Sequence, residues 1–460
     1  MKKKINITLI SILVLISLIF IKNRYGKSIS EAIFVLTNNK TLQIQPKKFN
    51  ETVDKFNETI DKKDKEIKSL KLENIRIINE TYPFLETIDE FIFHKSIRLI
   101  DNKFELVSYT NPFLKHLGPR AYIKKYKNNI YLLTGTGLLL TGDLSKETGS
   151  KVIFKKIKSN FSLISDKKYI KDEKSIITDL LIHKDIFYFV YRKKIKEKCY
   201  EISVLNGSLK EDLIFLSELF STNECQPVEA GAEGGKLTTY KDNKLLLTIG
   251  DHGSYEKQYN TNPQKLDNLL GKIISIDLKD KKYEIMSIGH RNQQGLKYQK
   301  DLDVIFSSEH GPKGGDEVNI NINPSNSDIK NYGWGISSYG EHYSPNEKLL
   351  EISPLYKSHT KYGFNEPVKN FTPSIGISQI ALSNLTKEKN LTLYVSALGY
   401  DIEEGDMSIH RLVFDRNLKI VNENTIKINE RIRDIYIDSD QDNEIFLFLE
   451  SSGSIAKLKL

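Results

Sequence analysis

A short motif recurs along most of this chain and constrains its fold more than any other feature. Each copy joins a turn of Lys, Asp, Asn or Gln to an apolar strand rich in aromatic and branched residues. The copies lie at residues 126–133, 183–188, 241–247, 299–305, 387–394 and 440–447. Their spacing, mostly about 50 to 60 residues, is typical of propeller blades of about four strands each. We therefore predict an all-β chain over residues 93–460, folded as a six-bladed β-propeller.

In a propeller, residues that are far apart in the sequence meet at the central axis. The innermost strand of each blade lines the channel, so residues at the start of each innermost strand converge on one face. The predicted starts carry Arg120, Thr178, Gly235, Gln294, Ser378 and Arg433. The wider gap between the fourth and fifth copies predicts an insertion over residues 312–373, which is rich in Gly, Pro, Asn and Tyr.

The N-terminus has the features of a targeting segment. Basic residues 2–4 precede an apolar run over residues 5–21, and charged residues follow at once. No small-residue cleavage site ends the run, which is near the short limit for crossing a bilayer. We predict an uncleaved signal anchor, a transmembrane helix over residues 1–24, with the propeller in the periplasm or outside the cell. A cleaved signal peptide is the alternative.

A polar linker over residues 25–46 leads into a heptad pattern over residues 47–82. The predicted a positions are Val53, Ile60, Ile67 and Asn74. Branched residues and a single Asn at a are typical of a parallel two-stranded coiled coil, although Lys63 at a d position weakens the seam. We therefore predict a coiled-coil-like helix and a homodimer through residues 49–77. The alternative is an amphipathic helix that packs against its own propeller.

The net charge of +8 reflects lysines spread along the whole chain, and no nucleic-acid-binding motif accompanies them. We therefore expect no nucleic-acid partner. The two cysteines, Cys199 and Cys225, predict one disulfide in an exported protein. Two unrelated thiols are the alternative.

Three arginines are candidates for binding an anion. Arg291 lies between two glycines in residues 289–295, with Asn292 beside it. Arg431 and Arg433 share one side of a predicted strand, because alternate residues of a strand point the same way. Guanidinium groups suit carboxylates, and a buried pair of arginines needs anions nearby. A structural turn around Arg291 and salt bridges to protein acids at the other two are the alternatives.

Three further features can take part in a site. Residues 309–319 combine acids with Gly and Pro, whose exposed carbonyl oxygens are ligands that Ca²⁺ accepts. Trp334 lies in a Gly-rich loop, where an aromatic ring can stack on a sugar or a cofactor or can simply pack the loop. His252 is a titratable side chain in a Gly-Asp-His-Gly turn after a strand.

Several motifs, in the right order, resemble those of the glucose/sorbosone dehydrogenase family, which includes soluble aldose sugar dehydrogenases. Residues 289–295 match its G-H-R-N-P-Q-G pattern with Gln293 in place of Pro, and residues 309–319 match E-x-G-P-x-G-G-D-E-x-N in full. The patterns N-Y-G-W and R-I-R-D match residues 331–334 and 431–434. The resemblance covers roughly residues 118–460.

This resemblance implies a six-bladed propeller with pyrroloquinoline quinone (PQQ) on its axis. It implies that Arg291, Asn292, Arg431 and Arg433 hold the quinone. It further implies a Ca²⁺ ion bound by the quinone and by the backbone carbonyls of Gly311 and Pro312. The ion would polarise the quinone for hydride transfer. The substrate would be an aldose, oxidised to a lactone.

The chain also departs from the family pattern. Ala232 stands where the family's general-base His is expected, and Lys236 stands in place of an Arg. A methyl group cannot accept a proton, and the loss of a general base typically costs about 10²–10⁴-fold in rate. Glu233 or His252 could replace the base, the substrate could need none, or the propeller could be a non-catalytic protein that binds a ligand or partner.

Overall fold

The computed structural model describes residues 88–460, except 115–119, 166, 174, 227–230, 326–327, 384–389, 400–405 and 438–443. The predicted anchor, linker and coiled-coil-like helix lie outside the described residues. Within the described part of the chain, no helix is both long and apolar enough to cross a membrane.

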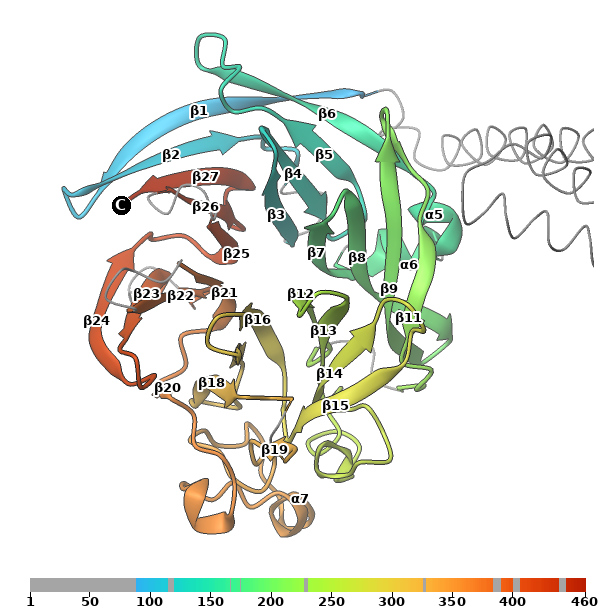
Figure 1. The fold of residues 1–460 in the computed structure, drawn as a ribbon, viewed down its shortest axis with the longest axis vertical. Helices are drawn as coiled ribbons and strands as arrows, with labels where there is room; N and C mark the ends of the chain where they lie inside the picture. Colours follow the sequence, from blue (N-terminus) through green and yellow to red (C-terminus); the bar gives the residue numbers. More distant parts are fainter. Residues whose placement is uncertain are drawn as a thin grey trace, which may run out of the picture. The chain divides into compact units, whose positions relative to one another are not determined.

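Antiparallel strands dominate the described residues, which confirms the all-β prediction, and successive strand groups lie around a common centre (Figure 1). The first group contains β3 (Ala121–Tyr126), β4 (Asn129–Thr134), β5 (Leu139–Gly142) and β6 (Lys151–Ser159). The next contains β7 (Ile177–His183), β8 (Ile186–Lys196), β9 (Cys199–Lys210) and β11 (Ser217–Ser221), and the third contains β12 (Gly234–Tyr240), β13 (Lys244–Ile249), β14 (Lys272–Asp277) and β15 (Tyr283–Ile288).

The remaining groups follow the same plan. One contains β16 (Gln293–Gln299), β17 (Val304–Glu309), β18 (Asp316–Ile322) and β20 (Lys369–Phe371), and another contains β21 (Ile377–Leu382), β22 (Leu391–Ala397), β23 (Ser408–Phe414) and β24 (Ile420–Lys427). The last contains β25 (Ile432–Ile437), β26 (Glu444–Leu449), β27 (Ser454–Lys459) and β2 (Phe104–Thr110). The apolar strand of each sequence repeat is the second strand of its group: β4, β8, β13, β17, β22 and β26.

The first strand of each group lies nearest the centre, and these strands contact one another in order: β3, β7, β12, β16, β21 and β25. Strand β25 in turn contacts β3, so the contacts close a ring. Strand β1 (Glu90–Ile100) pairs with both β2 and β6. The beginning of the described chain therefore links the last strand group to the first, as in a propeller.

Apolar clusters fill the spaces between neighbouring groups. Strands β13 and β26 are buried from their second residue onward, as their apolar sequences predict. One cluster joins Leu393 and Val395 of β22 to Phe306 of β17. Buried polar residues such as Thr248 of β13 and Ser307 of β17 lie within the same strands.

Polar side chains join neighbouring innermost strands. Asp179 accepts a hydrogen bond from the backbone N–H of Leu237 at 2.9 Å, and Asp434 accepts one from Ile123 at 2.8 Å. Both carboxylates are buried. Since a buried N–H without a partner costs about 1–3 kcal/mol, these bonds hold one strand group against the next.

Cys199 and Cys225 form the predicted disulfide, with 4.9 Å between their Cα atoms. It joins the start of β9 to the segment that leads toward β12. A disulfide is consistent with an oxidising compartment.

The bond between Asp179 and Leu237 generates a stability prediction. The substitution Asp179→Ala should lower the free energy of unfolding by about 1–3 kcal/mol, because the Leu237 N–H loses its acceptor in a buried place. Urea unfolding monitored by circular dichroism measures the change. Asp301→Ala is the control, since this residue is exposed and should matter by less than about 0.5 kcal/mol. Equal losses in the two variants would contradict the assignment.

Candidate functional site

A β-bulge near the start of each of five innermost strands shapes one end of the ring. The pairing register shifts at Ile177/Asp179, Gly234/Leu237, Gln293/Gly295, Ile377/Ile380 and Ile432/Asp434. The predicted convergent residues Thr178, Gly235, Gln294, Ser378 and Arg433 lie within these bulges, and Arg120 directly precedes β3. Bulges turn side chains out of the regular alternation, so this end of the ring, here called the hub, presents polar groups.

Arg431 and Arg433 meet at one carboxylate in the hub. Glu450 accepts from Arg433 Nε at 2.6 Å and from Arg431 Nε at 3.4 Å. Arg431 Nη1 also donates to the carbonyl of Gly399 at 2.8 Å. The predicted pair is therefore together, and the salt-bridge alternative holds for both members. Two guanidinium groups on one carboxylate leave one positive charge over.

Arg291 forms the second anion-binding element. Its Nη2 lies 3.0 Å from Glu256 Oε2, and its Nη1 donates to the Gly311 carbonyl at 2.9 Å. The guanidinium carbon lies 5.2 Å from the centre of the Trp334 ring. Its Nε is buried and has no hydrogen-bond acceptor among the described residues. An acceptor from a ligand would satisfy this orphaned donor.

Trp334 supports Arg291, whose guanidinium group lies over its ring, and its role as a cofactor contact stays a prediction. The indole is only 3% exposed, and its Nε1 donates to Asp251 Oδ2 at 2.7 Å. Asp251 also accepts from the backbone N–H of Gly253. Burial raises the pKa of Asp251 to about 6. Of the two readings of the sequence, loop packing therefore explains this Trp better than stacking on a ring.

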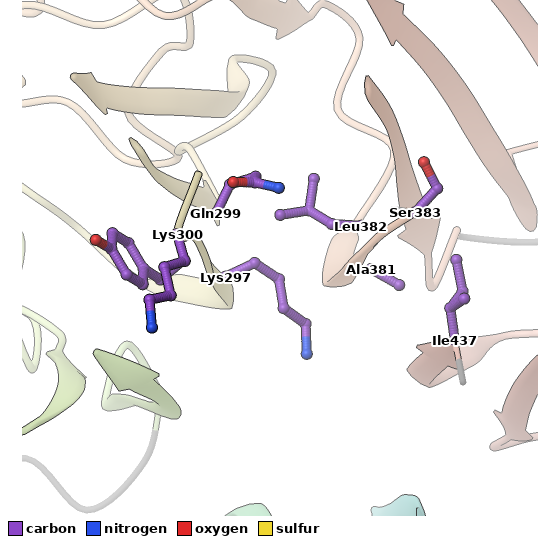
Figure 2. Close-up of a pocket in the computed structure, with 8 residues that line it drawn as sticks. Lys297, Gln299, Lys300, Ala381, Leu382, Ser383 and Ile437 are labelled. Atoms are coloured by element: carbon purple, nitrogen blue, oxygen red, sulfur yellow. The ribbon is translucent and has the colours of Figure 1, made fainter. Parts of the chain in front are cut away.

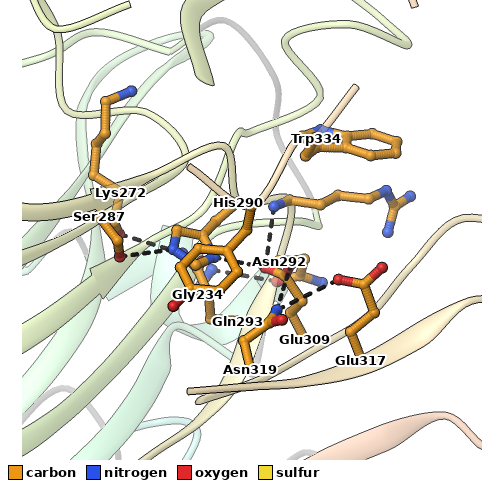
Figure 3. A network of polar contacts seen from close by, with 12 residues as sticks. Gly234, Lys272, Ser287, His290, Asn292, Gln293, Glu309, Glu317, Asn319 and Trp334 are labelled. Atoms are coloured by element: carbon orange, nitrogen blue, oxygen red, sulfur yellow. Dashed lines mark hydrogen bonds and ion pairs between the residues drawn. The ribbon is translucent and has the colours of Figure 1, made fainter. Parts of the chain in front are cut away.

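A hydrogen-bonded network of His290, Glu309 and Asn319 fixes the loop that carries Arg291 (Figure 3). His290 is fully buried between Ser287 and Glu309, at 2.8 and 3.2 Å. Glu309 also accepts from the Arg291 backbone N–H at 3.3 Å. Asn319 Nδ2 bridges Glu309 and Glu317, at 3.4 Å from each. Residues of the two sequence motifs 289–295 and 309–319 thus form one rigid support.

Glu233 is present in the hub but is a poor base. Its carboxylate lies 2.8 Å from Arg120 Nη1 and 4.0 Å from Arg192 Nη1. Burial alone would raise the pKa of Glu233, but these two guanidinium groups outweigh it and lower the pKa to about 2. A carboxylate of such low basicity is stable as an anion and takes up protons weakly.

His252 lies close to the position that lacks the family's base. Its backbone N–H donates to the carbonyl of Ala232 at 3.0 Å, and its imidazole interacts electrostatically with Glu233. Burial lowers the pKa of His252 to about 4. The imidazole is therefore neutral at pH 7, the form that can accept a proton.

The two predicted calcium ligands do not fit a cation in this arrangement. The Gly311 carbonyl accepts from Arg291 Nη1, and the Pro312 carbonyl accepts from the Ser374 hydroxyl at 3.5 Å. A guanidinium group within hydrogen-bond distance of a carbonyl repels a second cation at the same oxygen. Within the described residues, no three acidic, His or Cys side chains form a metal-binding group.

Sequence reasoning missed the acids that balance the arginines. Glu256 and Glu450 have no motif of their own, although Glu450 directly follows the strand of the last repeat. Arg192 was also missed: its Nε donates to the Tyr169 hydroxyl at 2.6 Å, and its Nη2 lies 2.8 Å from Glu173. A charged residue at the end of a buried apolar strand was the one signal that could have found Glu450.

Residues 176–457 match the family described as Glucose / Sorbosone dehydrogenase. Among curated proteins, an uncharacterized protein of Synechocystis sp., slr1608, is 32% identical over 246 residues, which span 47% of this chain and 56% of that protein. The aldose sugar dehydrogenase YliI of Escherichia coli is 28% identical over 274 residues, which span 55% of this chain and 67% of YliI.

Solved structures share the fold at low sequence identity. A glucose dehydrogenase superposes with a TM-score of 0.57 at 20% identity, covering 74% of this chain and 95% of that one. The PQQ domain of a pyranose dehydrogenase from Coprinopsis cinerea superposes with a TM-score of 0.52 at 10% identity, covering 80% and 97%. These likenesses support the propeller-like arrangement of the strands.

The pairing of Glu233 generates a pH prediction. The pKa of this carboxyl is lowered on folding, so its stabilising effect is complete above its ordinary value of 4.5 and is lost as the pH falls toward 2. Glu233→Gln should lower the free energy of unfolding by about 3 kcal/mol at pH 7, and the difference from the parent protein should vanish near pH 2. Denaturant unfolding across this range measures it. The exposed Glu351→Gln is the control, and a pH-independent loss in Glu233→Gln would contradict the assignment.

Proposed function

Because the chain belongs to the glucose/sorbosone dehydrogenase family, we propose that it is a quinone-dependent oxidoreductase that oxidises an aldose sugar outside the cytoplasm. The observation that carries the proposal is the shared carboxylate at Arg431 and Arg433, which leaves one guanidinium charge for a ligand. The orphaned Nε of Arg291 supports it. The similarity to YliI supports the choice of an aldose.

The residues fit a quinone that carries carboxylates. Arg431 and Arg433 would bind one carboxylate, and Arg291, held by Trp334, would bind another polar group. Asn292 lies beside Arg291, and its side-chain oxygen accepts from Gln294 at 2.8 Å. The bound quinone would accept the hydride from the anomeric carbon of the sugar. No step is assigned to Ca²⁺, because Arg291 is the cation at the Gly311 carbonyl.

His252 is our candidate for the general base, because its imidazole is neutral at pH 7 and its pKa of about 4 lies above that of Glu233. The side chain is buried, so its access to the sugar is part of the proposal. It would accept the proton of the anomeric hydroxyl while hydride leaves the carbon, so that the sugar ends as a lactone. Glu233 would not take this proton, since Arg120 and Arg192 keep it ionised and weakly basic. Its negative charge beside the imidazole would stabilise the imidazolium that forms.

Three further features belong to the same proposal. Counting β3, β7, β12, β16, β21 and β25 as innermost strands, we infer a propeller of six blades. We also retain the N-terminal anchor and the homodimer through residues 49–77 as proposals. The disulfide supports a location outside the cytoplasm.

A second function has a specific observation in its favour. The arginines that would bind the quinone each contact a protein carboxylate, either Glu256 or Glu450. Ala232 occupies the position of the family's base. Both facts would suit a non-catalytic propeller that binds a ligand or partner without oxidising it.

Reconstitution of the full-length protein in detergent separates the two functions. PQQ is titrated by calorimetry, and dye reduction is then followed with a panel of aldoses, with and without a calcium chelator. Quinone binding with turnover supports the oxidoreductase. Quinone binding without turnover of any aldose supports the non-catalytic protein, and the absence of quinone binding at every calcium concentration overturns the cofactor assignment.

The role of His252 generates a kinetic prediction. His252→Gln should lower kcat/KM by about 10²–10⁴-fold, because the substituted amide cannot accept the proton. The affinity for PQQ should stay within about twofold, since the arginines are untouched. His94→Gln, at an exposed position, should leave both quantities unchanged. An unchanged kcat/KM in His252→Gln would remove this residue as the base.

A further inference from the structure

A pocket lies at the end of the innermost strands opposite the hub. It is lined by Lys297, Tyr298, Gln299, Lys300, Ala381, Leu382, Ser383 and Ile437. These residues lie at or directly after the C-terminal ends of β16, β21 and β25. The hub lies at the N-terminal ends of the same strands. The pocket therefore does not belong to the proposed quinone site.

Lys297 extends from β16 toward the side of the pocket on which Ala381, Leu382 and Ile437 lie (Figure 2). Its ammonium interacts electrostatically with Lys124, Asp179 and Asp434. Those residues belong to β3, β7 and β25, so the side chain reaches into the interior of the ring.

The other two lysines of the ring interior have partners, whereas Lys297 makes no hydrogen bond or ion pair with the described residues. Lys124 lies 3.1 Å from Asp434, and Lys236 donates to the Thr178 carbonyl at 2.7 Å. Asp179 is engaged by the backbone N–H groups of Leu180 and Leu237. Three ammonium groups thus face two carboxylates that already have donors.

We propose that this pocket, here called the Lys297 pocket, binds a small carboxylate. The Lys297 ammonium would pair with the carboxylate, and the Gln299 amide offers a further donor at the rim. Leu382 adds a smaller apolar part to the lining.

The ionisation of Lys297 gives the site a pH dependence. Burial lowers the pKa of Lys297 to about 8, and the neighbouring Lys124 acts in the same direction. Asp179 and Asp434 oppose these effects. The ammonium is present below that pH, so a carboxylate should bind best below pH 8 and about tenfold more weakly per pH unit above it.

Chemical labelling of the full-length protein tests the proposal with butyrate as the probe. Lysines are modified with trinitrobenzenesulfonate at pH 8 and identified by peptide mass spectrometry. Butyrate should slow the labelling of Lys297 at least threefold and in a saturable manner, and it should leave the exposed Lys282 unaffected. Butyramide, a neutral molecule of the same shape, should give no protection. Absence of protection by butyrate, or equal protection by inorganic phosphate, would overturn the proposal.

Variants provide an independent readout by calorimetry. Lys297→Gln should abolish the heat of butyrate binding, Lys297→Arg should retain it, and Lys282→Gln is the matched surface control. His252→Gln should bind butyrate normally, which keeps a failure of the proposed catalytic function distinct from a failure of this site. Full butyrate binding by Lys297→Gln would show that the lysine is not the anchor.

Discussion

Closure of the ring depends on hydrogen bonds that one innermost strand makes to the next. Adjacent strand groups do not share a regular ladder at the centre, so the innermost strands have backbone N–H groups that face the next strand group and not a partner in their own sheet. Buried side chains such as Asp179, Asp434 and Gln379 accept hydrogen bonds from these groups across the gap. Thr178 and Arg433 lie in the bulges of the same strands, next to Asp179 and Asp434. The residues that close the ring and the residues of the hub are therefore neighbours in the sequence.

The charges of the hub are balanced locally and not as a whole. Glu450 is shared by two arginines, whereas Glu256 contacts Arg291 and also lies 3.6 Å from His342 Nδ1. An incoming anion must compete with these protein carboxylates for the arginines. The free-energy cost of desolvating the carboxylates has already been met in folding, whereas the ligand must still lose its own water. A ligand with one weakly placed charge gains little from such a site. A rigid ligand with several carboxylates can displace or share the resident acids, so the local pairing favours specificity over affinity.

The sequence predicted the fold well because each repeat contains its own turn and buried strand. It also identified the correct arginines, although Arg431 directly precedes β25 and Arg433 lies in the bulge at its start. It did not predict their partners. Glu450 is brought opposite Arg431 by the β25–β26 hairpin and Glu256 lies beyond the end of β13, and neither acid belongs to one of the motifs. The burial of Trp334 could not be predicted either, because it results from the packing of Tyr255 and Arg291 around the ring.

The relation between Ala232 and His252 shows why comparison position by position gives an incomplete view of this site. The two residues occupy different positions of the sequence, one before β12 begins and the other after β13 ends. A backbone hydrogen bond nevertheless holds them side by side. Both have a left-handed backbone, with φ of 57° and 50°. The close approach is possible because Gly250 lies between them, where a Cβ atom would lie 1.9 Å from the Ala232 carbonyl oxygen. The backbone of His252 therefore lies beside the position at which the family's base is expected, as the role proposed for His252 requires.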